Sequence, residues 1–268
     1  MPSIPRRHLL LASCSVVAPW PTWGQTARTP SASELPELIN KAGSLRMLSQ
    51  RLSKAWLAVG QNVETKRAAR VLQDSVAQFE RVQTDLKPLL PNPTTRSAHG
   101  QLEPLWNEFK SRLTASPPAQ PLVPALLGLD GRVLAQAHQL TQALEQHAAQ
   151  PISELVNLAG RQRMLSQFIA KSHLVMLWKS APTDLHTQVD AARAEFTRNL
   201  SRLDAAPQTT PALKQELLLA RQQWVFLESA AGRDERITAK DAAEVFVASE
   251  NLLELMDRIT QQYVRLGA

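Results

Sequence analysis

Apolar residues recur along this chain with the spacing of amphipathic α-helices, and proline-rich segments separate the helical stretches. Because an α-helix has 3.6 residues per turn, apolar positions three and four residues apart line one face. Proline lacks the backbone N–H that a helix interior uses, so the proline clusters at 88–93 and 117–121 should end helices. The pattern predicts helices over residues 33–60, 62–87, 96–114, 124–149, 152–180, 183–204, 210–231 and 238–265.

The helix predicted at 33–60 has two distinct faces. Positions 38, 42, 45, 49, 52, 56 and 59 read Leu, Ala, Leu, Ser, Leu, Trp and Val, which is the alternating four and three spacing of a bundle core. A more polar face carries Asn40, Gly43, Arg46, Met47, Gln50 and Lys54. We therefore expect the first face to pack inside its own bundle and the second to meet another helix.

The polar face occurs a second time, in the helix predicted at 152–180. Residues 37–54 align with residues 154–171 without an insertion. The two segments agree at Glu37/Glu154, Leu38/Leu155, Asn40/Asn157, Ala42/Ala159, Gly43/Gly160, Arg46/Arg163, Met47/Met164, Leu48/Leu165, Ser49/Ser166, Gln50/Gln167 and Lys54/Lys171. The chain is therefore expected to be a tandem duplication, with repeats at 33–149 and 151–268.

The fold class predicted is all-α, with two tandem four-helix bundles related by pseudo-two-fold symmetry. The repeats have almost no linker, so they should stack rigidly, with their first helices in contact near Gly43 and Gly160. Glycine costs about 1 kcal/mol relative to alanine inside a helix. Its recurrence at one position of both repeats favours a close approach of the two backbones. A kink, or simple tolerance of glycine, is the alternative.

Crossing the two polar faces brings Arg46 and Arg163 toward each other. Two guanidinium groups in a half-buried seam repel unless something negative lies between them. Arginine presents a planar fork of donors that suits flat oxyanions, so we expect a small inorganic anion at the seam. Alternatively, both arginines reach solvent or pair with local acids such as Glu37 and Glu154.

The repeated segment resembles two related families of sensor domains. Residues 39–47 look like the periplasmic box of nitrate/nitrite sensor histidine kinases. Residues 156–167 look like the input domain of type IV pili methyl-accepting chemotaxis transducers. In the kinases, this domain is a four-helix bundle that dimerises and holds its ligand between the two first helices through the box arginines and residues near the glycine.

By position, the resemblance implies ligand-binding roles for Gly43, Arg46, Gly160 and Arg163. Lys41 matches the lysine of the box, whereas Leu158 in the second repeat departs from it. The shared face adds further candidates, namely Asn40, Asn157, Met47, Met164, Gln50 and Gln167. One half of the predicted site therefore lacks the lysine charge.

These observations favour a soluble envelope protein that binds nitrate or nitrite at the seam between its repeats. The chain stops at Ala268 without a kinase or methyl-accepting segment, so we expect a sensor that scavenges its anion or reports it to a membrane sensor or transporter. Because the duplication takes the place of dimerisation, a monomer is expected. The alternative is a ligand-free helical adaptor that docks a membrane receptor or transporter. The departures at Leu158 and Arg161 keep this alternative open.

The start of the chain is typical of an export signal. Arg6 and Arg7 precede a short apolar run, as in twin-arginine signals, so residues 1–27 should direct the chain to the periplasm. Cleavage is plausible after Gly24 or after Ala27.

A lipid anchor at Cys14 is a second reading of the same segment. Residues 11–14 resemble a lipobox, but the apolar stretch before Cys14 is shorter than the usual h-region of about 7–15 residues. Both readings place the protein in the bacterial cell envelope.

Composition excludes several classes of protein. A net charge of +6 spread over 268 residues is too dilute to indicate nucleic-acid binding. Cys14 is the only cysteine and would leave with the signal, so neither a disulfide nor thiol chemistry is expected. No later window offers the run of about 18 apolar residues that a membrane span needs.

No catalytic motif stands out, so we expect no enzyme activity, no metal and no cofactor. The chain has no Gly-rich phosphate loop, no HExxH and no CxxCH. His173 could in principle join Met47 or Met164 around a haem, since helix bundles hold cofactors between facing helices. Both methionines are predicted on the face between the repeats, however, which favours packing over ligation.

Overall fold

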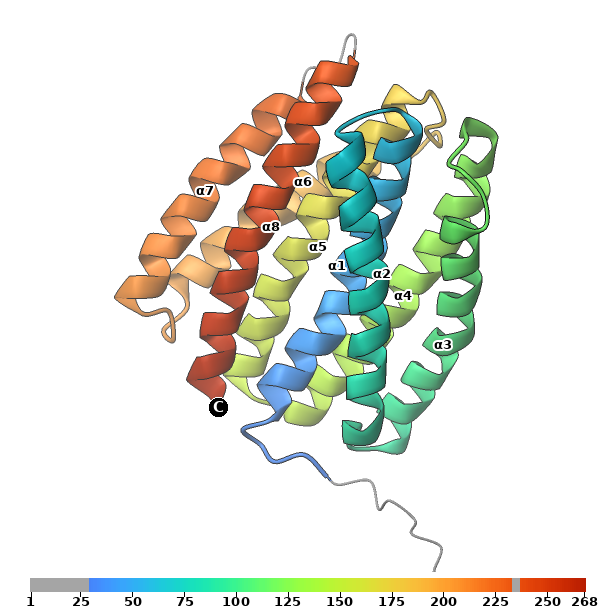
Figure 1. Cartoon of the computed structure of the whole chain (residues 1–268). Helices are drawn as coiled ribbons and strands as arrows, with labels where there is room; N and C mark the ends of the chain where they lie inside the picture. The colour runs from blue at the N-terminus through green and yellow to red at the C-terminus, as the bar shows by residue number, and fades with distance from the viewer. Residues whose placement is uncertain (1–28, 233–236) are drawn as a thin grey trace, which may run out of the picture.

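The computed structural model describes residues 29–232 and 237–268, and within these ranges it is all-helical (Figure 1). The elements are α1 Leu35–Gly60, α2 Thr65–Leu86, η1 Lys87–Leu89, α3 Pro93–Thr114, η2 Gln120–Leu122, α4 Val123–Ala148, α5 Pro151–Leu177, α6 Leu185–Ala205, α7 Pro211–Ala231 and α8 Ala239–Gly267. The all-α prediction is confirmed, and every predicted helix is present to within a few residues. The predicted export signal at 1–27, including Cys14, lies outside the described residues.

Helix ends follow the local chemistry that the sequence provides. Asn92 caps α3 by accepting a hydrogen bond from the backbone N–H of Thr95, and the Thr95 hydroxyl completes the capping box. Thr238 and Asp241 form the same arrangement at the start of α8. These caps satisfy backbone N–H groups that would otherwise lack partners in the first turn.

Two residues join the repeats. α4 ends at Ala148 and α5 begins at Pro151, so only Ala149 and Gln150 lie between them. Ala149 adopts a left-handed conformation with φ of 48°, and Gln150 is extended. This short connection holds the second bundle against the first.

α1 and α5 form the centre of the molecule, side by side and running in the same direction (Figure 1). α1 also packs against α2 and α4 of its own repeat, and α5 packs against α6 and α8. α3 covers α4, and α7 covers α8, so α3 and α7 are the outer helices. The two repeats therefore have the same arrangement, as expected for pseudo-two-fold symmetry.

Each repeat has the same aromatic pair in its core. Phe79 of α2 stacks on Trp106 of α3, with ring centroids 3.9 Å apart. Phe196 of α6 stacks on Trp224 of α7 at 4.2 Å. These rings fix which residues of α3 and α7 correspond, because Trp106 and Trp224 occupy equivalent places.

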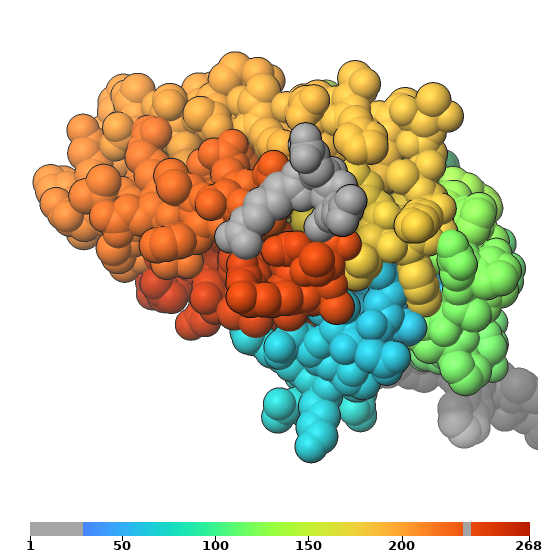
Figure 2. Space-filling view, turned by 90° about the horizontal axis from the view of Figure 1, so that it is seen from above, coloured from blue at the N-terminus to red at the C-terminus, as the bar shows by residue number. Residues whose placement is uncertain are grey.

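The C-terminal ends of the central helices, α1 and α5, pack tightly at the end of the molecule that Figure 2 shows. A Cβ atom on Gly60 would lie 2.3 Å from the ring of Trp178, so only glycine fits at the end of α1. Gln120, from the α3–α4 connection, donates a hydrogen bond of 2.6 Å to the carbonyl of Trp178. Seen from this end, the α1–α2 turn lies against the start of α8 (Figure 2). In the described part of the chain, no helix is long and apolar enough to cross a membrane.

Candidate functional site

The polar faces of α1 and α5 meet at the seam between the repeats, and both arginines are buried there. Arg46 is 0% exposed and Arg163 is 2% exposed. A Cβ atom on Gly43 would lie 3.2 Å from Nη2 of Arg46 and 4.0 Å from Nη2 of Arg163. A Cβ atom on Gly160 would lie 3.2 Å from Nη2 of Arg163 and 3.8 Å from Nη2 of Arg46. Two guanidinium groups therefore gather over two glycines.

The arginines explain why both repeats have a glycine at this position. The atoms nearest to the absent Cβ atoms belong to side chains, chiefly the guanidinium groups, and not to the backbone of the opposite helix. The expected close approach of two backbones is therefore not the reason for the glycines. They provide room for arginine side chains that fold back over the helix surface.

Arg46 contacts two neutral acceptors. Its Nη2 donates to Oδ1 of Asn157 at 2.6 Å, and its Nη1 lies 3.3 Å from Nδ1 of His138 on α4. Asn157 in turn donates to the carboxylate of Glu145, which orients its oxygen toward Arg46. Burial, together with the charges of Arg46 and Arg161, lowers the pKa of His138 to about 4. The imidazole is therefore neutral at neutral pH and can accept from Arg46.

Arg163 has a similar amide partner but also a carboxylate. Its Nη2 donates to Oδ1 of Asn40 at 2.7 Å, and Asn40 donates to Glu37 at 3.2 Å. Its Nη1 forms an ion pair with Asp257 of α8, whose side chain is half exposed. The two halves of the seam are thus alike at the asparagines and different at the third partner, His138 or Asp257.

The charge at the seam is only partly compensated. Burial lowers the pKa of Arg46 to about 9, and repulsion from Arg161 and Arg163 contributes to the shift, yet the group stays charged at neutral pH. The Nε atoms of Arg46 and Arg163 are buried and have no hydrogen-bond partner. One carboxylate, that of Asp257 on Arg163, contacts the pair of guanidinium groups, and Glu145 acts on Arg46 from behind Asn157. Within the described residues, Arg46 therefore has no contacting counter-charge, and both arginines have unused donors.

A second polar layer lies one to two turns further along the same helices. Nζ of Lys54 binds Glu250 at 2.7 Å and Ser249 at 2.9 Å, both on α8. Nζ of Lys171 pairs with Asp130 of α4. Each lysine therefore crosses to the other repeat. Burial alone would raise the pKa of Glu250, but Lys54 and Arg51 together lower it to about 2.

The two glutamines of the repeated face belong to this lysine layer. Gln50 donates to Asp130 at 2.8 Å and accepts from Lys171 at 2.6 Å. Gln167 donates to the carbonyl of Ser249 at 2.9 Å. Both side chains therefore support the seam from one turn away and do not contact the arginines.

Six of the predicted residues come together at the centre of the seam: Asn40, Gly43, Arg46, Asn157, Gly160 and Arg163. Lys41 does not join them, because its Nζ points toward α2, 3.7 Å from Asp85. Met47 and Met164 are buried. Met47 and Asp257 also line a hollow of about 270 Å³ beside the arginine pair.

Sequence reasoning missed the partners that α4 and α8 supply. Asp130 and Glu250 are charged residues in apolar stripes, and a charge at a core position could have marked them. His138 and Asp257 lie at partly exposed positions, and no sequence signal distinguishes them. The local acids considered for the arginines serve elsewhere, since Glu154 pairs with Arg202 and Glu37 binds Asn40.

Two like helical bundles, joined through a buried cationic seam, define a tandem all-α protein with a candidate anion site between its repeats. A family model described as the N-terminal region of type IV pili methyl-accepting chemotaxis transducers matches residues 31–150 and again residues 147–252. The chain belongs to this family and contains two copies of its domain. The family is one of chemoreceptor input domains and not of enzymes. No curated protein and no solved structure matches the chain.

Proposed function

We propose that this protein binds a small inorganic oxyanion, nitrate or nitrite, at the seam between its two repeats. The observation that carries the proposal is Arg46, a fully buried guanidinium group whose hydrogen-bond partners are an amide and a neutral imidazole. A buried charge that lacks a counter-charge is costly. A bound anion would offset this cost.

The donor set suits a flat monovalent anion. Arg46 and Arg163 share the space above Gly43 and Gly160, and each retains a free Nε donor. Guanidinium groups bind planar oxyanions through pairs of parallel hydrogen bonds. Because Asp257 already balances one of the two positive charges, a single negative charge completes the balance.

Membership of a chemoreceptor input family indicates that ligand binding is reported to a partner. We propose that the partner is a membrane receptor or transporter and that the protein works in the periplasm. Support for this location comes from the twin-arginine signal expected at 1–27.

A thermal-shift screen with nitrate, nitrite, sulfate and chloride tests the proposal. Ligand at 100 times its dissociation constant should stabilise the folded protein by about 2.7 kcal/mol. Arg46→Ala should remove this response. Arg202→Ala, which changes a half-exposed arginine in a surface ion pair, is the matched control and should keep it. If millimolar nitrate and nitrite leave the melting temperature of the wild type unchanged, the proposal is wrong for these ligands.

The ligand-free adaptor is the second candidate. It is favoured by the protein acceptors that both arginines already have, Asn157 for Arg46 and Asn40 with Asp257 for Arg163. In that case the wild type shows no anion response, and Arg46→Ala weakens only the docking of a protein partner. The same screen therefore separates the two candidates.

A further inference from the structure

The outer surface of α7 carries a cluster of exposed apolar side chains. Leu218, Leu219, Val225 and Phe226 are 47% to 62% exposed. We define the α7 face by the exposed residues between positions 215 and 229: Gln215, Leu218, Leu219, Gln222, Val225, Phe226 and Ser229. Clustered exposed apolar side chains of this size mark interaction sites more often than single ones do.

The first repeat provides an internal comparison. Since Trp106 and Trp224 occupy equivalent places, the exposed positions of α3 match those of α7 one by one. The α3 counterparts of Leu218, Leu219, Val225 and Phe226 are Gly100, Gln101, Asn107 and Glu108. These four positions are exposed in both repeats, but their residues are polar or small in α3 and apolar in α7. Bundle packing alone does not require the apolar residues.

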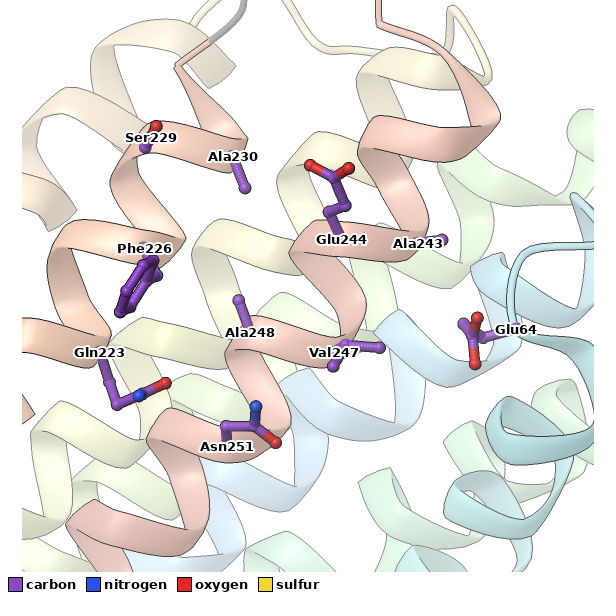
Figure 3. A pocket seen from close by; sticks show the side chains of 10 residues that line it. All are labelled: Glu64, Gln223, Phe226, Ser229, Ala230, Ala243, Glu244, Val247, Ala248 and Asn251. Carbon is purple, nitrogen blue, oxygen red and sulfur yellow. The ribbon is translucent and has the colours of Figure 1, made fainter.

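A hollow of about 600 Å³ lies beside the α7 face, between α7 and α8 (Figure 3). Phe226 and Gln223 line it from α7, and Val247 and Ala248 line it from α8 (Figure 3). The carboxylates of Glu244 and Glu64 also line it, at its α8 side and at the α1–α2 turn (Figure 3). The hollow gives an inserted aromatic ring a place to pack.

We propose that the α7 face is the interface through which two copies of this chain form a two-fold dimer. In such a contact the same patch serves both partners, so a patch with like charges would repel itself. The seven residues of the α7 face are uncharged, and the charged residues that adjoin it, Lys214 and Arg221 on α7 and Glu64 and Glu244 in the hollow, are of both signs. Phe226 of each copy can enter the hollow of the other, so the two contacts are equivalent, as two-fold symmetry requires.

The available area suits a dimer of ordinary size. α7 has 21 residues, so it is about 31 Å long. The α7 face alone is about 10 Å wide, or about 300 Å² in projection, and α8, packed beside it at an interaxial distance of about 9 Å, brings the surface to about 600 Å². Stable interfaces bury about 800 Å² per partner, and side-chain relief raises the accessible area above the projected value.

The difference between the repeats also explains why the proposed assembly stops at a dimer. A pseudo-symmetric protein with the same apolar face on both repeats would offer two patches. Its copies would then assemble into open-ended oligomers. Polar residues at the four α3 positions leave one patch per molecule, and one patch closes into a dimer. This proposal departs from the monomer expected from the duplication. The duplication places the contact of α1 with α5 within one chain, but it leaves the α7 face uncovered.

Sedimentation velocity from about 1 to about 100 µM tests the proposal, because interfaces of this size have dissociation constants from micromolar to picomolar. The wild type should sediment as a dimer, and Val225→Asn with Phe226→Glu should make it a monomer by giving α7 the residues of α3. Asn107→Ala with Glu108→Ala, at the equivalent positions of α3, is the matched control and should remain a dimer.

The reverse exchange gives an independent test. Asn107→Val with Glu108→Phe adds a second patch and should produce assemblies larger than a dimer. Helical content and melting temperature, measured by circular dichroism, will show that each variant is folded. A wild type that is monomeric throughout this range, or an α7 double variant that is folded and still dimeric, would overturn the proposal. Neither result depends on anion binding.

Discussion

The two arginines of the seam differ in one partner, and this difference sets their roles. Asp257 pairs with Nη1 of Arg163, whereas the same nitrogen of Arg46 faces the neutral imidazole of His138. Asp257 therefore behaves as an anion that belongs to the protein. The proposed anion site predicts that Asp257 competes with the ligand for Arg163.

Asp257→Asn should tighten nitrate or nitrite binding. The amide keeps the shape of the side chain but removes its negative charge, so the seam gains one net positive charge. A charge-assisted contact exceeds a neutral one by roughly 1.4 kcal/mol, which corresponds to about tenfold in affinity. Calorimetric titration measures the change, with the exposed Asp190→Asn as control. Equal or weaker binding in Asp257→Asn would show that the carboxylate does not compete with the ligand.

His138 should make stability depend on pH in the acidic range. Its pKa falls from the usual 6.5 to about 4 in the folded protein, so the unfolded chain binds the proton more readily. The contribution of neutral His138 to the free energy of unfolding is complete above pH 6.5 and is lost as the pH falls toward 4. Allowing for partial exposure, we expect a loss of about 1 kcal/mol between pH 7 and pH 5. Urea unfolding at both values should show this loss in the wild type and a smaller one in His138→Gln.

Among the elements, the positions of the helices could be predicted from local sequence patterns. The pairing of α1 with α5 could be predicted from the duplication. Apolar periodicity located each helix, and a polar face with Gly43, Arg46 and Gln50 that recurs at Gly160, Arg163 and Gln167 indicated which faces would meet. The partners on α4 and α8 could not be derived in this way. Which side chain reaches Arg46 or Lys171 depends on the rotation and stagger of helices that have no repeated signature.

The seam glycines should gain less from alanine than a helix glycine with open space around it. Gly128 of α4 has nothing within 4 Å of its missing Cβ, so Gly128→Ala should stabilise the protein by about 0.5–1 kcal/mol. In Gly43→Ala the new methyl group lies 3.2 Å from Nη2 of Arg46. Displacement of the guanidinium should cancel that gain and reduce the anion response. Urea unfolding and thermal shift measure both effects, and equal stabilisation by the two variants would contradict this account.

For the whole molecule, the crossed lysines hold the repeats together. The pair of Lys171 with Asp130 is buried on both sides. Lys171→Met leaves a buried carboxylate without its cation and should cost about 3–5 kcal/mol in urea unfolding. Lys87→Met breaks an exposed pair with Glu103 and should cost less than about 1 kcal/mol. A loss in Lys171→Met no larger than in this control would show that the crossed pair contributes little.

The two-residue connection, Ala149 and Gln150, makes the assembly of the seam independent of the protein concentration. A ligand site built between two separate copies of a domain disappears when dilution separates them. Here the two halves belong to one chain, so the second half is always present at a high effective concentration. The seam therefore stays assembled in a single molecule at any expression level, whereas the proposed contact through α7 forms only when the protein is abundant. The two proposals together give one molecule a binding site that does not depend on its own concentration and a surface whose occupancy does.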